Sequence, residues 1–202
     1  MEHLGEAGCI THSPDGLFGV PLEEIQAVNS KGIPLVVTGC LATVEASGLD
    51  TVGIYRLSST KTKIDELRGL LAAGHYDALN MVEDWDINTV SCLFKQWLRE
   101  LPDPLCTHKL YQAFVDLGPG PTVKQVKDLV AKIPHNHRLV LRVVLEHLQK
   151  VASHSSMNKM EVSNLAAIFG PNLIRPLGDE DFRIDRQISA VDFLITHAAE
   201  LF

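Results

Sequence analysis

The chain has 202 residues, a formal net charge of −7, and 46% hydrophobic against 21% charged residues. This length and apolar content fit one folded domain with a sizeable core and exclude an intrinsically disordered chain. The acidic balance argues against a general binder of nucleic acid or anionic membranes, because those surfaces select for an excess of Lys and Arg.

The apolar runs are short. The run at residues 33–37 is among the longest, and a bilayer needs about 20 apolar residues. The N-terminus lacks the basic start and apolar core of a signal peptide. Residues 1–16 carry Gly and Pro without any period, which predicts a flexible N-terminal tail followed by one domain over residues 17–202. We therefore expect a cytoplasmic domain without direct membrane insertion, recruited to membranes, if at all, through other parts of a longer protein.

Cysteine and histidine give no sign of a metal site. The four cysteines are scattered without a Cys-x-x-Cys pair, at Cys9, Cys40, Cys92 and Cys106. This predicts free thiols, with Cys40 and Cys92 serving as small buried residues of helices. His135 and His137 have no Cys or carboxylate cluster close in sequence and are expected on the surface. We expect no metal and no cofactor belonging to the chain itself.

Helical patterns broken by Pro, Gly and Asn follow one another along the chain, with almost no alternation of period two. They predict an all-α, single-domain helical bundle. Helices are expected at about residues 34–47, 60–73, 87–101, 109–117, 123–133, 138–153, 159–170 and 185–202.

Four of these helices carry specific expectations. Asp86 should cap the helix at 87–101, and that helix should bury Trp97 in the core. Asn158 and Glu161 fit a capping box for the helix at 159–170. Gly170-Pro171 should end that helix and leave Asn172 just beyond it. The buried faces of two further helices are expected to carry Ile64, Leu67, Leu70, Leu71, Leu139, Val143, Leu145 and Leu148.

Three cations form a candidate site. Arg56 lies in the loop between the first two helices, at residues 49–58. Lys95 and Arg99 are four residues apart and fall together on the face of their helix opposite the apolar stripe. An arginine on a loop, with other cations held nearby by a rigid scaffold, can neutralise the charge on a phosphoryl group being transferred. Each piece alone is more often an ordinary surface residue.

Four sequence segments occur in one order and carry a family resemblance. They are Phe18-Gly19-Val20-Pro21-Leu22, Gly53-Ile54-Tyr55-Arg56, Lys95-x-x-x-Arg99-Glu100-Leu101-Pro102-Asp103-Pro104-Leu105, and Asn164-Leu165-Ala166 with Phe169-Gly170-Pro171-Asn172-Leu173. Together they resemble the Rho GTPase-activating protein (RhoGAP) domain family over about residues 17–202. The resemblance implies an activator of GTP-bound Rho-, Rac- or Cdc-type small GTPases.

The resemblance also implies residue roles. Arg56 would be the finger that enters the active site of the partner GTPase, while GTP and Mg²⁺ belong to that partner and the chain is not itself an enzyme. Arg99 would hold the finger loop through the loop backbone, and whether it also touches the partner stays open. Lys95 and Asn172 would contact the switch regions of the GTPase. We expect the chain to be a monomer that binds no nucleic acid.

Two departures from the family pattern keep a second interpretation open. Ser59 stands where the family commonly has glycine, and Val52 stands where an acidic residue is frequent. A glycine would permit positive φ, so Ser59 is expected to shift the loop slightly and to lower catalytic efficiency. The alternative is a catalytically weak module that binds GTPases without stimulating them. A hydrolase with its own site finds no support, since the sequence has no Gly-x-x-x-x-Gly-Lys loop and no recognisable Ser/His/Asp arrangement.

Overall fold

The computed structural model describes residues 16–81, 85–118, 120–178 and 182–202. Among these residues the regular elements are helical, and the remaining β feature is an isolated antiparallel bridge between Val28 and Pro34. The α-helices are α1 (Leu35–Ser47), α2 (Lys61–Ala72), α3 (Ile87–Glu100), α4 (Tyr111–Val115), α5 (Val123–Val130), α6 (His135–Ser153), α7 (Ser155–Asn158), α8 (Val162–Leu173), α9 (Ile184–Thr196) and α10 (Ala198–Leu201). Short 3-10 helices lie at Leu22–Glu24, Tyr76–Asn80 and His108–Leu110. The predicted all-α class is confirmed.

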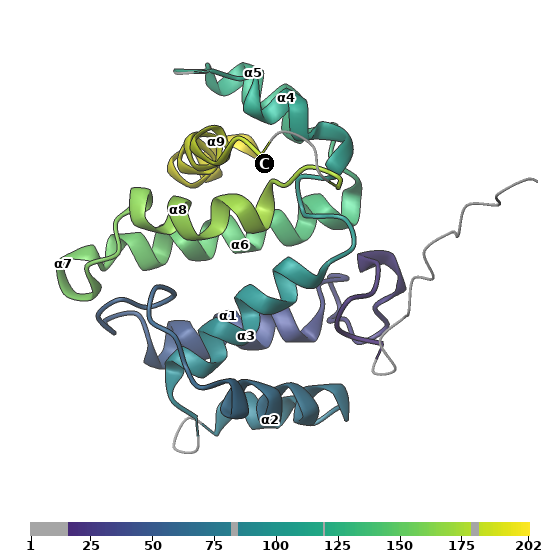
Figure 1. Cartoon of the computed structure of the whole chain (residues 1–202), viewed down its shortest axis with the longest axis vertical. Helices are drawn as coiled ribbons and strands as arrows, with labels where there is room; N and C mark the ends of the chain where they lie inside the picture. Colours follow the sequence, from purple (N-terminus) through teal and green to yellow (C-terminus); the bar gives the residue numbers. More distant parts are fainter. Residues whose placement is uncertain (1–15, 82–84, 119, 179–181) are drawn as a thin grey trace, which may run out of the picture.

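The helices stack in layers (Figure 1). Helix α2 lies at one end, followed by α1 with α3 and then by α6 with α8, while α9, α4 and α5 lie at the other end. Helix α3 packs against α1, α2 and α8, and α6 packs against α1, α8 and α9. Two long helices, α3 and α6, therefore connect the layers through the middle of the molecule.

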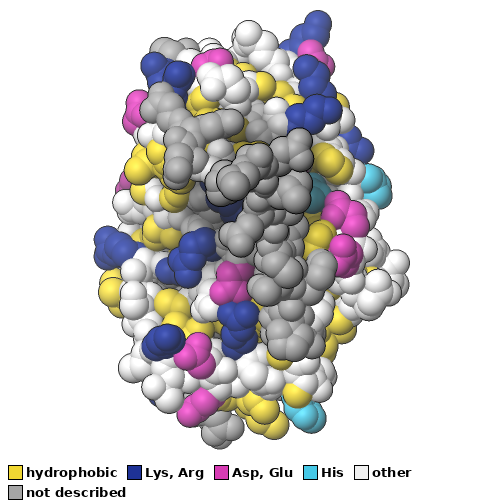
Figure 2. Space-filling view, turned by 45° about the vertical axis from the view of Figure 1, so that its right-hand side comes forward, with side chains coloured by type: hydrophobic (Ala, Val, Ile, Leu, Met, Phe, Trp, Pro, Cys, Tyr) yellow, Lys and Arg dark blue, Asp and Glu magenta, His cyan; other side chains and the backbone are white. Residues whose placement is uncertain are grey.

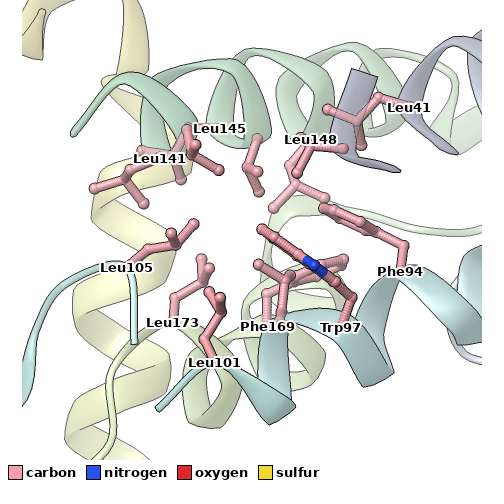
Figure 3. Packing of buried hydrophobic residues seen from close by; sticks show 14 of the residues in the cluster. Leu41, Phe94, Trp97, Leu101, Leu105, Leu141, Leu145, Leu148, Phe169 and Leu173 are labelled. Carbon is pink, nitrogen blue, oxygen red and sulfur yellow. The ribbon is translucent and has the colours of Figure 1, made fainter. Parts of the chain in front are cut away.

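One core joins these layers (Figure 3). Phe94 and Trp97 of α3 point toward Phe169 of α8, and Leu145 and Leu148 of α6 close the other side; all five side chains are fully buried. The Trp97 indole Nε1 donates a hydrogen bond to the carbonyl of Leu17 at 3.0 Å. Trp97 is thus the core residue that its helical spacing predicts.

Several helix ends follow the local sequence signals. Pro34 precedes α1 and Gly48 follows it. Asp86 caps α3, with its side chain accepting a hydrogen bond from the backbone N–H of Asn88 at 3.0 Å. Thr122 and Gln125 form a capping box at the start of α5. These ends were predictable because each depends on residues within one turn.

The expected start and buried face of α6 were partly wrong. The helix begins at His135, three residues early, because Pro134 already supplies a non-helical N-cap. Leu139 and Val143 are half-buried, whereas Val140, Leu141 and Val144 are buried. His137, expected on the surface, is buried and contacts the Pro104 carbonyl through Nδ1 at 3.1 Å.

The expected stripe of α2 was wrong at one position. Leu67 and Leu71 are buried and Ile64 packs partly against the core, but Leu70 is exposed. The final predicted helix is also broken, because α9 ends at Thr196 and α10 starts after His197.

Helix α8 differs most from its prediction. It starts after Glu161, with no side-chain cap, and continues through Gly170-Pro171 to Leu173. Gly170 lies where α8 crosses α9, and a Cβ there would stand 3.2 Å from the backbone nitrogen of Ile188. The glycine permits close packing between the two helices rather than ending α8. Asn172 therefore lies in the last turn of α8.

The predicted tail, residues 1–16, lies outside the described residues except for Gly16, and Cys9 lies outside them as well. Leu17 and Phe18 are already buried in the core. Within the described ranges, none of the helices is long and apolar enough to cross a membrane. The face in Figure 2 shows cationic and acidic side chains interspersed rather than one continuous basic field.

Candidate functional site

The loop between α1 and α2 buries two side chains and exposes the one that follows them. Ile54 and Tyr55 are 0% exposed, whereas Arg56, the next residue, is exposed. Gly53 and Tyr55 both have positive φ, +73° and +68°. Glycine adopts this conformation readily, but a residue such as Tyr55 rarely does. The two positive-φ residues mark a tight turn. This turn places Arg56 at the surface.

Two contacts from α7 fix the base of the loop, which lies beside α7 in Figure 1. The backbone N–H of Gly53 donates to the carbonyl of Asn158 at 2.8 Å. The fully buried side-chain amide of Asn158 donates to the carbonyl of Leu49 at 2.7 Å and to that of Val151 at 2.9 Å. Asn158, predicted as a helix cap, instead joins the loop to the α6–α7 corner.

The peptide group before Arg56 is held on both sides. Lys95 Nζ, reaching from α3, donates a hydrogen bond to the carbonyl of Tyr55. The backbone N–H of Arg56 donates to the carbonyl of Gly53 at 2.8 Å. Burial lowers the pKa of Lys95, and the nearby Arg99 lowers it further while Cys92 opposes the shift. Lys95 is thus half-buried and in contact with the loop.

Beside the loop is a hollow of about 370 Å³, here called the loop-side hollow. Its lining comes from the loop, α2, α3 and α8, and comprises Ser58, Ser59, Ile64, Cys92, Lys95, Gln96, Arg99, Ile168 and Asn172. Three predicted site residues, Lys95, Arg99 and Asn172, therefore meet in one place. Arg56 lies on the same loop but does not line the hollow.

The resemblance implied that Arg99 holds the loop backbone, and the structure differs on this point. Lys95 makes that contact, while the side chain of exposed Arg99 has no hydrogen bond or ion pair with the described residues. Arg99 lies one helical turn beyond Lys95 and lines the hollow beside the loop. Asn172 Nδ2 donates to the Ile168 carbonyl at 2.7 Å, which keeps its side chain folded against α8.

Ser59 is held on α3. Its hydroxyl lies 2.7 Å from the hydroxyl of Thr89, which is fully buried. Ser59 is not among the positive-φ residues of the described chain, so a glycine is not needed at this position. The positive-φ residues of this loop are instead Gly53 and Tyr55. The departure at Ser59 therefore adds a contact rather than a distortion.

Sequence reasoning missed Arg175. Its guanidinium donates to the carbonyls of Leu98 and Leu101 at the end of α3 and to that of Asn172 at the end of α8. It joins the two helix ends that carry Lys95, Arg99 and Asn172. The available signal was a basic residue just past a predicted helix end, where such side chains often bind free carbonyls.

No group of three His, Cys, Asp or Glu residues in the described ranges is arranged to hold a metal ion. Cys40 and Cys106 are buried free thiols, and burial raises the pKa of Cys40 to about 12. Cys92 is half-buried at the loop-side hollow, with Sγ 3.6 Å from the carbonyl of Leu57, rather than buried as predicted. The chemistry that these residues offer is positive charge and hydrogen-bond donation at a protein surface.

Comparison with known families identifies this arrangement. The model of the RhoGAP domain matches residues 34–177. The chain belongs to the RhoGAP domain family. The family therefore covers the loop with Arg56, the α3 cations and Asn172 together.

Curated relatives agree with this assignment. GTPase-activating protein pac-1 of Caenorhabditis elegans is 35% identical over 179 residues, which cover 83% of this chain and 11% of that protein. Rho GTPase-activating protein 21-B of Xenopus laevis is 38% identical over 170 residues, 81% of this chain and 9% of that protein. Rho GTPase-activating protein gacJJ of Dictyostelium discoideum is 35% identical over 190 residues, 92% of this chain and 21% of that protein. The chain spans about a tenth to a fifth of the length of these relatives.

Solved structures share the fold. The crystal structure of human Rho GTPase activating protein 15 superposes with a TM-score of 0.80 at 26% identity, covering 96% of this chain and 94% of that one. The BH domain of GRAF, the GTPase regulator associated with focal adhesion kinase, gives a TM-score of 0.72 at 27% identity, covering 83% and 92%. The helical bundle is thus the RhoGAP fold, and the family supports a role in activating Rho GTPases.

Proposed function

We propose that this domain accelerates GTP hydrolysis by a GTP-bound Rho-family small GTPase, with Arg56 inserted in trans as the finger. The observation that carries the proposal is the contrast within one turn, where Arg56 is exposed and its preceding residue is completely buried. The side chain of Arg56 makes no hydrogen bond or ion pair with the described residues, so its guanidinium is available to a partner. A guanidinium stays charged and can donate to two phosphate oxygens at once.

The chemistry would take place in the partner. GTP and Mg²⁺ would be bound by the GTPase, and this domain would supply one cation to the charge that builds on the transferred phosphoryl group. Because the hydrolytic site would lie in the GTPase, the domain is a regulator rather than an enzyme with its own substrate. Arg99 and Asn172 would face the partner from the loop-side hollow, while Lys95 would act mainly by holding the loop.

The surface around Arg56 suits a protein partner. Val52 and Leu57 flank the finger position and are 56% and 47% exposed. Apolar side chains around a central arginine are typical of protein interfaces, where Arg is enriched. Val52 replaces the acidic residue frequent in the family, so this edge of the contact would be apolar rather than charged. The proposal is of a cytoplasmic monomer that docks on its GTPase through this surface, binding no nucleic acid and inserting no segment into a membrane.

The test is single-turnover GTP hydrolysis by a panel of Rho-, Rac- and Cdc-type GTPases, with and without the domain. The wild-type domain should accelerate at least one of them, and Arg56→Ala should remove about 10³- to 10⁵-fold of that acceleration. An Arg142→Ala variant, changed at an exposed arginine of α6, controls for loss of positive charge. Binding of a GTP-loaded GTPase without acceleration would support the weak binding module instead and would overturn the proposal.

A further inference from the structure

Tyr55 is unusual because it combines complete burial with a positive φ, a backbone conformation that non-glycine residues rarely adopt. It has φ of +68°, is 0% exposed, and directly precedes Arg56. Its ring packs edge-on against Phe169, with ring centroids 5.0 Å apart, and against Phe94, with centroids 6.5 Å apart. Aromatic packing alone would suit phenylalanine equally well, so the hydroxyl must be explained separately.

The hydroxyl begins a buried chain of polar contacts. Tyr55 Oη lies 2.6 Å from His147 Nε2 on α6, and His147 Nδ1 lies 2.9 Å from Glu45 Oε1 on α1. The other carboxylate oxygen of Glu45 accepts from Lys150 Nζ at 2.6 Å. Tyr55 and His147 are buried, and this series of contacts reaches the surface only at Glu45 and Lys150.

These contacts allow one arrangement of protons. The Glu45 carboxylate can only accept, so His147 Nδ1–H donates to it and Nε2 of the neutral ring accepts from the Tyr55 hydroxyl. Burial is the largest influence on the pKa of His147 and lowers it, which keeps the ring neutral near pH 7. Burial also raises the pKa of Tyr55, so the phenol keeps its proton. The hydrogen bonds that join Tyr55, His147 and Glu45 thereby have a single donor–acceptor arrangement.

We infer that the Tyr55–His147–Glu45 chain positions Arg56 for catalysis, which makes Tyr55 and His147 positioning residues of the RhoGAP site. The inference rests on the proposed function. The hydroxyl fixes one end of the tyrosine through α6 and α1, while Lys95 holds its carbonyl from α3. The peptide group that carries Arg56 is therefore oriented from two directions, and the exposed guanidinium leaves a rigid base.

The Tyr55–His147–Glu45 contacts have a simpler role as well, since buried polar groups need hydrogen-bond partners for the protein to be stable. A purely stabilising network and a positioning network differ in one respect. If the network acts through Arg56, its loss should weaken binding to the transition state more than binding to the ground state, and only while Arg56 is present. A loss of stability alone would leave both affinities of the folded protein unchanged.

The decisive variant is Tyr55→Phe, which keeps the ring and removes only the hydroxyl. Tyr111→Phe is the matched control, because Tyr111 of α4 is also buried and its hydroxyl accepts from the backbone N–H of Arg183 at 3.1 Å. The assay measures the dissociation constant for the GTPase loaded with a non-hydrolysable GTP analogue and for the same GTPase with GDP and aluminium fluoride. The maximal single-turnover rate is measured at saturating domain.

Tyr55→Phe should lower the maximal rate and the affinity for the aluminium fluoride complex by about 10- to 100-fold, with little change in affinity for the GTP-analogue complex. In an Arg56→Ala background the same substitution should cause no further loss. Tyr111→Phe should leave all three quantities unchanged. His147→Leu leaves the Tyr55 hydroxyl without an acceptor and should reproduce the Tyr55→Phe effect. The variant that combines Tyr55→Phe with His147→Leu should have a maximal rate no lower than that of His147→Leu alone.

The outcomes separate the two proposals. If the wild-type domain accelerates hydrolysis, Arg56→Ala abolishes it and folded Tyr55→Phe keeps the full rate, the positioning inference alone is overturned. The positioning inference is also overturned if Tyr55→Phe costs as much in the Arg56→Ala background as in the wild type. If the wild-type domain accelerates none of the GTPases, the proposed function is overturned, and the inference with it.

Discussion

Two hollows on this molecule are both rich in cations, yet their cations are used differently. The loop-side hollow carries Lys95 and Arg99 beside the loop with Arg56. At the other end, a hollow of about 360 Å³, here called the C-terminal groove, lies between α5, α6 and α10. It is lined by Lys127, Val130, Ala131, His135, Arg138, Leu139, Arg142, Leu201 and Phe202.

The cations of the C-terminal groove are largely engaged with their own chain. Lys127 donates to the carbonyl of Glu200 at 2.9 Å, Arg138 donates to that of Ala131 at 3.2 Å, and Arg142 pairs with Glu146 at 2.7 Å. At the loop-side hollow, Lys95 donates to the Tyr55 carbonyl, but the side chains of Arg99 in the hollow and of Arg56 on the adjoining loop have no such partner among the described residues. Local basic composition therefore does not distinguish the two hollows, whereas the proposed site differs in having exposed arginines without side-chain partners beside an anchored loop.

The largest expected difference is between Arg56, on the loop beside the loop-side hollow, and Arg142 of the C-terminal groove, and it concerns the guanidinium group. Arg56→Lys keeps the charge but loses the planar fork, so the maximal hydrolysis rate should fall by about 10²- to 10³-fold. Arg142→Lys, the same change in the C-terminal groove, should leave the rate within error of the wild type. Single-turnover hydrolysis with a responsive GTPase measures both. Equal rates for the two variants would mean that position 56 needs only a positive charge.

How much of this comparison could be predicted from the sequence depends on the range of each interaction. The ends of α1 and α3 follow from Gly48 and Asp86 because caps act within one turn. Arg56, Lys95, Arg99 and Asn172 could be predicted as candidate site residues because they belong to contiguous segments that resemble the family. Gly170 led to a wrong predicted end for α8, since its purpose is the approach of α9, which local sequence cannot show.

The interior support of the site could not be predicted for the same reason. Tyr55 and His147 are 92 positions apart in sequence, and the Asn158 side chain reaches Leu49 across 109 positions. Nothing in the spacing of such residues signals a hydrogen bond, because only the packed bundle brings them together. Residues proposed to touch a partner are thus easier to predict from sequence than the buried residues that hold the loop in place.

A second comparison uses two lysines that make the same kind of contact. Lys95 donates to the Tyr55 carbonyl in the loop, and Lys127 donates to the Glu200 carbonyl near the end of the chain. Lys95→Ala should lower the maximal hydrolysis rate about tenfold, roughly the equivalent of one hydrogen bond of about 1.4 kcal/mol from a charged donor. Lys127→Ala should leave the rate unchanged. A similar loss in both variants would show that the measured effect is general destabilisation rather than support of the loop.

The smallest expected effect concerns the far end of the loop, where Ser59 bonds to buried Thr89. Ser59→Ala leaves the Thr89 hydroxyl without this partner and should lower the free energy of unfolding in urea by about 1–2 kcal/mol. Ser58→Ala is the control, because exposed Ser58 makes no hydrogen bond with the described residues. Because Ser59 lies three residues beyond Arg56 and outside the positive-φ turn, the hydrolysis rate should change by less than about threefold in either variant. If Ser59→Ala instead accelerated hydrolysis without loss of stability, Ser59 would be restraining the finger, and the loop-side hollow would be less well adapted to catalysis than its geometry indicates.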